Sequence, residues 1–366
     1  MRHWNGIVLG GRATGAALPG LTTRPDGAQA VSIHRFGTLP DGTEICRICL
    51  HTKAGACGSV ITLGASLQDF AVPLSGAGHR RVVLGFPTLA GYLADTNYIG
   101  ATAGRYASRI TAGRLPIEGR LYQLSVNERG RNHLHGGQVG FSARPWRILS
   151  ADDCSVVLAL TSPDGDQGYP GTLEARCTYR LEEPATLRIL MTATTDALTV
   201  VNLAHHSYLT LLPGESIGRH LLEVAARHTV PLDRELLPTG EIRAVTGTEA
   251  DFRTLRPIGS PESGYDQVFV LDRPDQSLMR AARLLAPDRL VGMELWTTEP
   301  CLVFYDGSHI APGAPGFDGA PYQPRAGLCL EPQRFPDSPN HPWFPSAVLG
   351  PSALYHQLTE YRFYTP

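Results

Sequence analysis

The sequence is poor in charged residues, and neither sign of charge dominates. Charged residues make up 18% of the 366 residues, and 32 Lys and Arg stand against 34 Asp and Glu, a net charge of −2. Proteins that bind nucleic acids or anionic membranes usually carry a basic excess, because contacts with phosphate supply much of the binding energy. We therefore expect neither nucleic acid nor membrane as a partner. A neutral ligand fits this balance well.

Long hydrophobic runs are also missing. No stretch approaches the roughly 20 apolar residues that span a bilayer, although a hydrophobic content of 42% allows a sizeable core. The first residues, MRHWNGIVLGGRATGAALPG, lack the continuous apolar centre of a secretory signal peptide. We expect a Gly/Ala-rich N-terminal tail over residues 1–30 and a single large domain over residues 31–366.

The cysteines show no pairing pattern. There are seven, an odd number, and several lie in strand-like apolar runs such as CRICL. This distribution is typical of reduced, mostly buried thiols in a cytoplasmic protein. Cys46 and Cys49 match C-x-x-C, but no second cysteine pair follows at zinc-finger spacing, so a redox or zinc motif is not favoured.

Helical periodicity is scarce, and only residues 275–285 (DQSLMRAARLL) resemble a helix. Short apolar runs with a period of two recur between turn signals such as Pro-Asp-Gly at 163–165, and this pattern indicates half-buried antiparallel strands. The expected strands are 59–70, 155–162, 173–181, 186–194, 198–203, 267–271, 290–296 and 301–305. The sequence predicts an all-β protein, a large antiparallel β-sandwich with few short helices. Pro-rich loops at 311–324 and 332–345 are natural places for a binding site.

Polar residues concentrate in five segments beyond what a core needs. The segments are GRYASRI (104–110), NHLHGG (132–137), NLAHHSY (202–208), GYDQ (264–267) and LEPQRFPD (330–337). In a strand, His133 and His135 would point to one face, as two zinc ligands do, with His205 or His206 as a third. No H-E-x-x-H sequence supports this metal site, and we do not favour it.

Two further kinds of chemistry can be weighed from the residues. Residues 214–218 (GESIG) match the G-x-S-x-G of serine hydrolases, but Pro213 precedes them and a loop is expected instead of the required strand, turn and helix. Glu331 and Asp266 could pair as in a glycosidase, or Glu331 could be a strand-end carboxylate paired with an arginine. Spacing alone leaves both interpretations of Glu331 open.

The five segments together resemble the aldose 1-epimerase (galactose mutarotase) family. GRYASRI is similar to that family's G-R-x-A-N-R-I, NHLHGG to N-x-L-H-G-G, and VNLAHHSYLTL to N-L-T-N-H-S-Y-F-N-L. GYDQVFVL is similar to Y-D-H-N-F-V-L, and LEPQRFPDSPNHPWFPS to L-E-T-Q-x-F-P-D-x-x-N-x-x-x-F-P-S. A sixth match surrounds the L-P-T-G at 237–240. The motifs keep the family's order from about Phe36 to the C-terminus.

The resemblance implies a supersandwich fold, an enzyme that interconverts the α and β anomers of a free aldose, and no metal or organic cofactor. It implies that Glu331 is the general base for the anomeric hydroxyl and that His206 is the general acid for the ring oxygen. A carboxylate and an imidazole, with reference pKa values of about 4.3 and 6.5, can hold opposite protonation states near neutrality. Further sugar contacts are implied for the remaining motif residues, which are Arg109, His135, Asp266, Ser108 and Tyr208. The expected partner is a monosaccharide, and the expected assembly is a monomer or a homodimer.

Four positions depart from the family pattern. Ser108 replaces an Asn, Ala204-His205 replaces Thr-Asn, Gln267 replaces a His, and Val303 replaces a Gln that often contacts the sugar. We expect His205 and Val303 to remove or shift at least one hydroxyl contact. The departures affect the identity of the sugar more than the reaction.

Two other functions are compatible with such a sandwich. One is a non-catalytic sugar-binding module, against which the retention of both Glu331 and His206 argues. The other is a phosphosugar mutarotase, which would need a basic cluster near the site. The arginines available for that cluster are Arg105, Arg129, Arg131 and Arg334.

Overall fold

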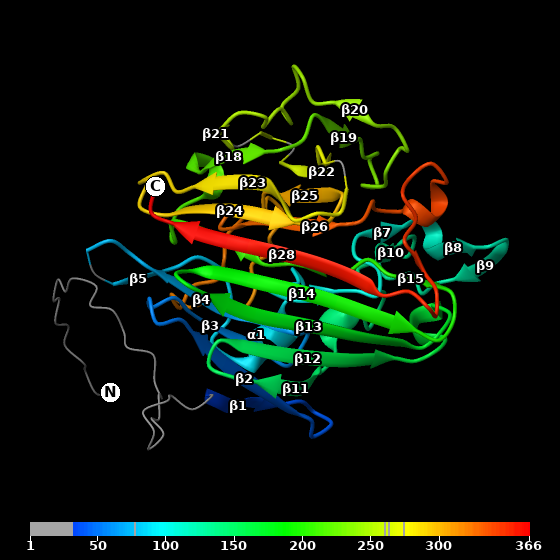
Figure 1. Cartoon of the computed structure of the whole chain (residues 1–366), viewed down its shortest axis with the longest axis horizontal. Coiled ribbons are helices and arrows are strands. Elements are labelled where there is room, and N and C mark those ends of the chain that lie inside the picture. Colours follow the sequence, from blue (N-terminus) through cyan, green and yellow to red (C-terminus); the bar gives the residue numbers. More distant parts are fainter. Residues whose placement is uncertain (1–31, 77, 260, 263, 274) are drawn as a thin grey trace, which may run out of the picture.

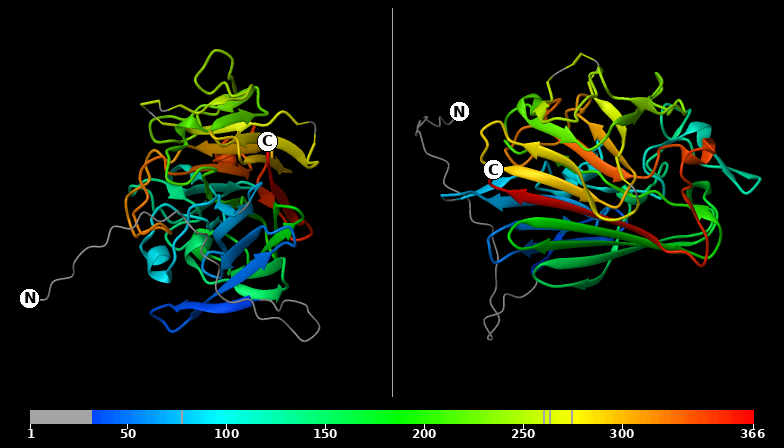
Figure 2. Two further views of the ribbon diagram at one scale, coloured as in Figure 1. Left: turned by 90° about the vertical axis from the view of Figure 1, so that its left-hand side faces the viewer. Right: turned by 45° about the horizontal axis from the view of Figure 1, so that its top comes forward.

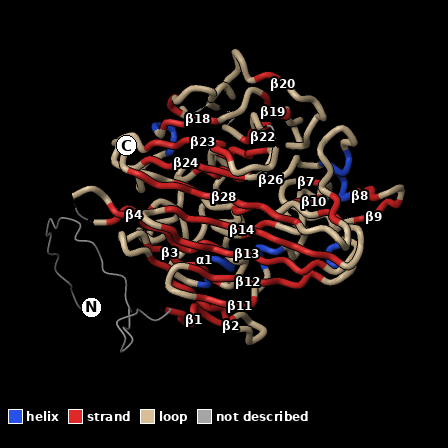
Figure 3. The backbone as a smooth tube through the Cα atoms, in the orientation of Figure 1, coloured by secondary structure: helices blue, strands red, loops and turns tan. Residues whose placement is uncertain are grey.

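The computed structural model describes residues 32–366 except 77, 260, 263 and 274, and strands dominate it (Figure 3). The expected tail over residues 1–30 lies outside the described residues. One short helix, α1 (Leu89–Ala94), begins at Thr88, whose side chain accepts a hydrogen bond from the Gly91 amide. The described part also holds five 3-10 turns, η1 (Thr111–Gly113), η2 (Phe141–Ala143), η3 (Asp166–Gly168), η4 (Ile217–Arg219) and η5 (Ser338–Asn340). None of the described helices is long and apolar enough to cross a bilayer.

The largest sheet has nine strands and runs across the whole molecule (Figure 1). In spatial order its strands are β11 (Arg147–Ala151), β12 (Ser155–Ser162), β13 (Leu173–Glu182), β14 (Thr186–Thr195), β28 (Tyr355–Tyr364), β24 (Gly292–Thr297), β23 (Met279–Leu285), β18 (Leu221–Val224) and β21 (Arg256–Pro257). The C-terminal strand β28 lies between β14 and β24, and so joins the two halves of the sheet.

Two smaller sheets complete the sandwich. The six-stranded sheet has the order β17 (Tyr208–Leu209), β26 (Leu328–Gln333), β25 (Cys301–Tyr305), β22 (Asp266–Val270), β19 (His228–Val230) and β20 (Arg243–Ala244). The five-stranded sheet follows chain order with β1 (Ser32–Thr38), β2 (Glu44–His51), β3 (Cys57–Ile61), β4 (Ser66–Pro73) and β5 (His79–Arg81). In the turned views its blue strands lie alongside the green strands of the large sheet (Figure 2).

Four two-stranded pairs connect these sheets. They are β7 (Arg109–Ile110) with β10 (His133–Leu134), β6 (Thr102–Ala103) with β16 (Ala204–His205), β15 (Thr199–Val200) with β27 (Val348–Leu349), and β8 (Arg114–Ile117) with β9 (Arg120–Gln123). The main core cluster contains Leu67 of β4, Met191 of β14 and Leu330 of β26, each almost fully buried. One hydrophobic core is therefore shared by all three large sheets, and the predicted all-β sandwich is confirmed.

The strand predictions differ from the structure at two places. The run 59–70 is a hairpin of β3 and β4, because Gly64 and Ala65 both have positive φ values and turn the chain back. The run 198–203 forms only the short strand β15. The remaining strands lie within two residues of their predicted bounds.

The predicted helix over 275–285 is wrong. Residues Met279–Leu285 form strand β23, which pairs with β24 on one side and β18 on the other. A bulge between Arg280 and Ala282 allows Ala281 and Ala282 to be buried together. This bulge breaks the period of two that marks a strand in the sequence, and pairing on both sides overrides the local helix propensity.

Candidate active site

Cross-strand pairs place several predicted site residues on one face of the six-stranded sheet. Tyr208 lies opposite Cys329, Cys329 opposite Tyr305, and Tyr305 opposite Asp266. Residues directly opposite one another in an antiparallel sheet share a face. Glu331 lies two residues beyond Cys329 on β26, and so its side chain projects from that same face.

His206 reaches this face from the loop between β16 and β17. Its backbone is fixed on both sides, since its amide donates to Ala101 and its carbonyl accepts from Gly100. The ring places Nε2 3.6 Å from Glu331 Oε1 and Nδ1 3.6 Å from the thiol sulfur of Cys329. The structure thus brings together the two residues that the sequence predicts as acid and base.

Burial changes the protonation of this pair. Glu331 is 3% exposed, and burial, together with the charge of Asp266, raises the pKa of its carboxyl to about 8. Burial lowers the pKa of the His206 imidazole to about 4. The two pKa values lie in the reverse of their ordinary order, so near pH 7 the pair holds one proton in total. Glu331 and His206 therefore carry one exchangeable proton between them.

Arg109 lies in β7, and His135 directly follows β10, the strand that pairs with β7. The Arg109 guanidinium donates three hydrogen bonds to the Glu128 carboxylate, at 2.7 to 3.0 Å. The Ser108 amide donates to His135 Nδ1 at 3.2 Å, which leaves Nε2 to carry the hydrogen of the neutral ring. Burial holds the pKa of His135 well below its usual value. His135 is therefore a neutral hydrogen-bond donor 5.4 Å, between ring centroids, from His206.

Tyr98 is a site residue that sequence reasoning missed. Its ring centroid lies 4.7 Å from that of His135 and 5.8 Å from that of His206. Its φ of 58° is uncommon for a tyrosine and directs the chain into Gly100, where a Cβ would lie 2.2 Å from a backbone oxygen. The Tyr-x-Gly spacing just before the first polar segment is the signal that could have indicated it. Tyr208 forms a further wall, with its ring centroid 5.3 Å from that of His206.

Two of the four departures from the family pattern point away from the site. His205 lies in the sandwich core, where one ring nitrogen contacts the Tyr179 hydroxyl at 3.2 Å and the other contacts the Ser207 hydroxyl at 2.7 Å. Both nitrogens of His205 therefore have partners inside the protein, and the expectation that this replacement removes or shifts a hydroxyl contact to the sugar stays a prediction. Gln267 follows Asp266 on β22, and so it projects from the opposite face.

Val303 does lie at the site, directly opposite Glu331 on the neighbouring strand. It packs in an apolar cluster with Val268 and Phe335. An apolar side chain here offers a sugar no hydrogen bond, as the sequence comparison predicted. Ser108, with a φ of 62°, uses its backbone to hold His135.

Two alternative interpretations, a zinc site built on His133 and His135 and an arginine partner for Glu331, do not fit the structure. His133 bonds to the Ser125 carbonyl and the Tyr169 hydroxyl, and β10 ends at Leu134, so His133 and His135 do not continue one strand face. The side chain beside the Glu331 carboxyl is that of His206, and no arginine pairs with it among the described residues. Residues 214–218 form a turn followed by η4, which confirms the expected loop.

A phosphate-binding cluster of the four arginines is not formed. Arg105 is 1% exposed, and its terminal nitrogens donate to backbone carbonyls and hydroxyls of the sandwich, Ser162 and Pro170 among them. Arg334 lies over the Tyr355 ring, and Arg131 pairs with Glu235. These contacts leave Arg105 unable to meet a phosphate.

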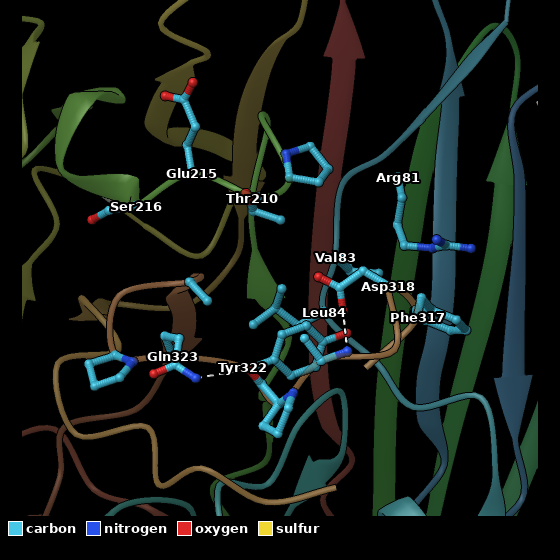
Figure 4. A pocket seen from close by; sticks show the side chains of 16 residues that line it. Arg81, Val83, Leu84, Thr210, Glu215, Ser216, Phe317, Asp318, Tyr322 and Gln323 are labelled. Atoms are coloured by element: carbon cyan, nitrogen blue, oxygen red, sulfur yellow. Dashed lines mark hydrogen bonds between the residues drawn. The ribbon is translucent and has the colours of Figure 1, made fainter. Parts of the chain in front are cut away.

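Among the cavities of the structure, two have similar volumes. One, of about 490 Å³, lies between the 213–216 turn and the 317–326 loop, with Thr210 and Tyr322 among its walls (Figure 4). Another, of about 460 Å³, is lined by Tyr98 and Asn127. Neither is lined by the acid–base pair, so we assign the chemistry by the geometry of Glu331 and His206. Tyr98 links the second cavity to that pair.

The fold and the site together define a β-sandwich protein with a buried carboxyl–imidazole pair on the open face of an antiparallel sheet. The family model for aldose 1-epimerase matches residues 47–362. The Escherichia coli aldose 1-epimerase is 35% identical over 336 residues, which cover 88% of this chain and 96% of that protein. The human galactose mutarotase is 37% identical over 347 residues, covering 90% and 97%.

Solved structures agree with these relatives. An aldose epimerase homologue from Caenorhabditis elegans superposes with a TM-score of 0.82 at 28% identity, covering 87% of this chain and 98% of the other. Galactose 1-epimerase from Lactobacillus acidophilus gives a TM-score of 0.77 at 27% identity, covering 91% and 98%. The chain belongs to the aldose 1-epimerase family. It is an isomerase that acts on a sugar, a mutarotase.

Proposed function

We propose that the protein exchanges the α and β anomers of a free aldose by means of Glu331 and His206. Opening the hemiacetal requires a proton removed from O1 and a proton delivered to the ring oxygen. Rotation about C1–C2 and reclosure then give the other anomer. The observation that carries the proposal is the 3.6 Å separation of His206 Nε2 and Glu331 Oε1, with both side chains nearly fully buried. At that distance the two groups are close enough to act on neighbouring oxygens of one sugar.

The shared proton fits this reaction. The ionised Glu331 with a protonated His206 is ready for ring opening. After the two transfers Glu331 is protonated and His206 is neutral, which is the arrangement that burial favours. Ring closure reverses both transfers, so the pair returns to its starting state. The cycle conserves the proton count and consumes no co-reactant.

The surrounding residues suit a neutral polyol. The His135 ring supplies a donor through Nε2, Arg109 supplies a cationic donor, and Asp266 supplies an acceptor whose pKa burial raises. We infer that Ser108, through the backbone that holds His135, and Tyr208, as an apolar wall, complete the sugar site. Val303 makes the position beside Glu331 apolar. This favours a sugar that places no hydroxyl group against Val303.

A panel of free aldoses followed by anomer-exchange NMR tests this function. We expect at least one aldose to equilibrate faster than its spontaneous rate, and we expect Glu331→Gln to lower kcat by roughly 10² or more. Gln267→Asn, on the opposite face of β22, is the matched control and should keep the wild-type rate. Tight sugar binding without rate enhancement for any aldose would favour the binding module instead, and a preference for the 6-phosphate over the free sugar would favour a phosphosugar enzyme.

The assembly and the cellular compartment remain predictions. All seven cysteines are free thiols, which supports a reducing compartment such as the cytoplasm. Size-exclusion chromatography with light scattering distinguishes a monomer from a homodimer.

A further inference from the structure

Three side chains at the acid–base pair offer three different metal-ligand atoms. The sulfur of Cys329, an imidazole nitrogen of His206 and a carboxylate oxygen of Glu331 all lie within 4.8 Å of one another, and no other such group occurs in the part of the chain that the structure describes. Cys329 has no task in the proton transfers. All three residues are nearly fully buried, at 0%, 6% and 3% exposure.

The spacing of these atoms is close to that of a tetrahedral metal site. With zinc–sulfur and zinc–nitrogen bonds of about 2.3 and 2.05 Å, the nitrogen and sulfur of such a site stand roughly 3.6 Å apart. His206 Nδ1 and Cys329 Sγ are 3.6 Å apart. Glu331 Oε1 lies nearer the other ring nitrogen, Nε2, so the carboxylate must move toward the Nδ1 side to complete the site, within which the three ligand atoms lie no more than 4.8 Å apart. Two of the three ligands are therefore already placed.

One carboxylate oxygen of Glu331 also lacks a hydrogen-bond partner among the described residues. This oxygen, Oε2, is buried. A buried carboxylate oxygen without a partner is costly, and a bound cation would satisfy it. This orphaned oxygen is an observation independent of the ligand spacing, and it points to the same group.

We propose that His206, Cys329 and Glu331 form a binding site for a thiophilic divalent cation such as Zn²⁺, and that occupation of this site inhibits the enzyme. On binding, the Cys329 thiol and the Glu331 carboxyl each lose a proton to solvent, bonds form from the metal to sulfur, nitrogen and oxygen, and water ligands leave the ion. One water can remain at the fourth position. Oxygen-preferring cations such as Mg²⁺ are not expected to bind, because a thiolate and an imidazole are poor ligands for them.

The inhibition rests on the function proposed above, whereas the binding does not. A metal ion at this site binds the Glu331 carboxylate that must accept a proton, and by binding Nδ1 it prevents His206 from becoming the imidazolium that must donate one. It also stands where the anomeric centre must lie. Zinc and sugar should therefore compete, and a chelator should restore activity.

Titration with Co²⁺ tests the binding without any activity measurement. Cobalt in a tetrahedral site with a thiolate ligand gives intense visible bands and a sulfur charge-transfer band. We expect these bands at one equivalent with the wild-type protein and their loss in Cys329→Ala, or in Cys329→Ser if the alanine variant folds poorly. The matched control is Cys301→Ala, which removes a buried cysteine that faces the same way on β25 but lies opposite Gln333.

The activity arm measures the Zn²⁺ concentration that halves the anomer-exchange rate. We expect Cys329→Ala to raise that concentration by about tenfold to a hundredfold, and Cys301→Ala to leave it unchanged. Mg²⁺ at the same concentrations should have no effect. The absence of the cobalt bands, or equal shifts in the two cysteine variants, overturns the proposal. Cobalt bands that depend on Cys329 in a protein without mutarotase activity would refute the proposed function and leave the metal site standing.

Discussion

At the scale of single residues, the side chains of two adjacent histidines lie in different environments. His206 faces Glu331 and the site, while His205 is held in the core by Tyr179 and Ser207. The motif resemblance separated the two in sequence, and it predicted that His205, which stands in place of an Asn, removes or shifts a sugar contact. Only the packing shows which side of the chain each ring occupies.

This contrast predicts a pair of variants with opposite effects. His206→Asn should lower kcat by roughly 10² or more with little change in stability. His205→Asn should lower the free energy of unfolding by about 1 to 3 kcal/mol, because buried hydroxyls lose their partner, and should keep kcat within a few-fold. Urea unfolding and anomer-exchange kinetics on both variants check this. A large loss of kcat in His205→Asn, with the fold intact, would contradict the assignment.

The sequence could indicate Glu331, His206, Arg109, His135 and Asp266 because their motifs resemble a known family. It offered only a Tyr-x-Gly spacing at Tyr98 and no signal at Cys329, since neither belongs to a polar motif and each reaches His206 only through folding. Nor could it give the reversed order of the two pKa values. That reversal comes from burial, which depends on the side chains that surround the pair.

At the scale of elements, the site depends on short strands and on glycine turns. Strand β26, which carries Glu331, was not among the predicted strands, and β7, β10, β16 and β17 have two residues each and leave no periodic signal. Strand β23 was mistaken for a helix because its bulge removes the alternation. Local patterns therefore predict several strands that build the sandwich, but they miss the long C-terminal strand β28, as well as β26 and the two-residue strands at the site.

Gly136 tests whether glycine turns position the site residues, because it directly follows His135 in a turn outside any strand. Its φ is 91°, and a Cβ there would lie 1.7 Å from the Gly104 carbonyl oxygen. Gly136→Ala should cost about 3 kcal/mol or more, from backbone strain plus the clash, and should raise KM by displacing His135. Gly130→Ala, at a φ of 66° with open space around it, is the control and should cost about 1 kcal/mol. Equal losses in the two variants would show that the close approach to Gly104 is unimportant.

At the scale of the whole molecule, one hydrophobic core is shared by three sheets, and the buried side chain of Arg105 connects distant chain segments around it. Arg105 donates to carbonyls of Pro170, Gly171, Ser162 and Pro163. Burial lowers the pKa of its guanidinium to about 10, so it remains charged at neutral pH. The sequence listed Arg105 as a possible phosphate ligand, and its structural role appears only once these distant segments meet.

Replacing Arg105 should therefore affect folding. Arg105→Met should lower the free energy of unfolding by about 3 kcal/mol or more, since several buried carbonyls lose their only charged donor. Arg131→Met, which removes an exposed ion pair with Glu235, should cost less than about 1 kcal/mol. Chemical denaturation of both variants measures the difference. A loss in Arg105→Met no larger than in Arg131→Met would contradict this structural role.

The pH dependence of kcat/KM for anomer exchange tests most directly whether Glu331 and His206 share one catalytic proton. The spontaneous rate at each pH is subtracted, because acid and base also catalyse the reaction in water. We predict that kcat/KM is constant between about pH 4 and about pH 8. Below pH 4 His206 takes up a proton, so the pair holds two protons, and above pH 8 Glu331 loses the single shared proton. A rate that keeps rising through pH 9, or that falls on the acid side near pH 6.5 as for an ordinary histidine, would contradict the account.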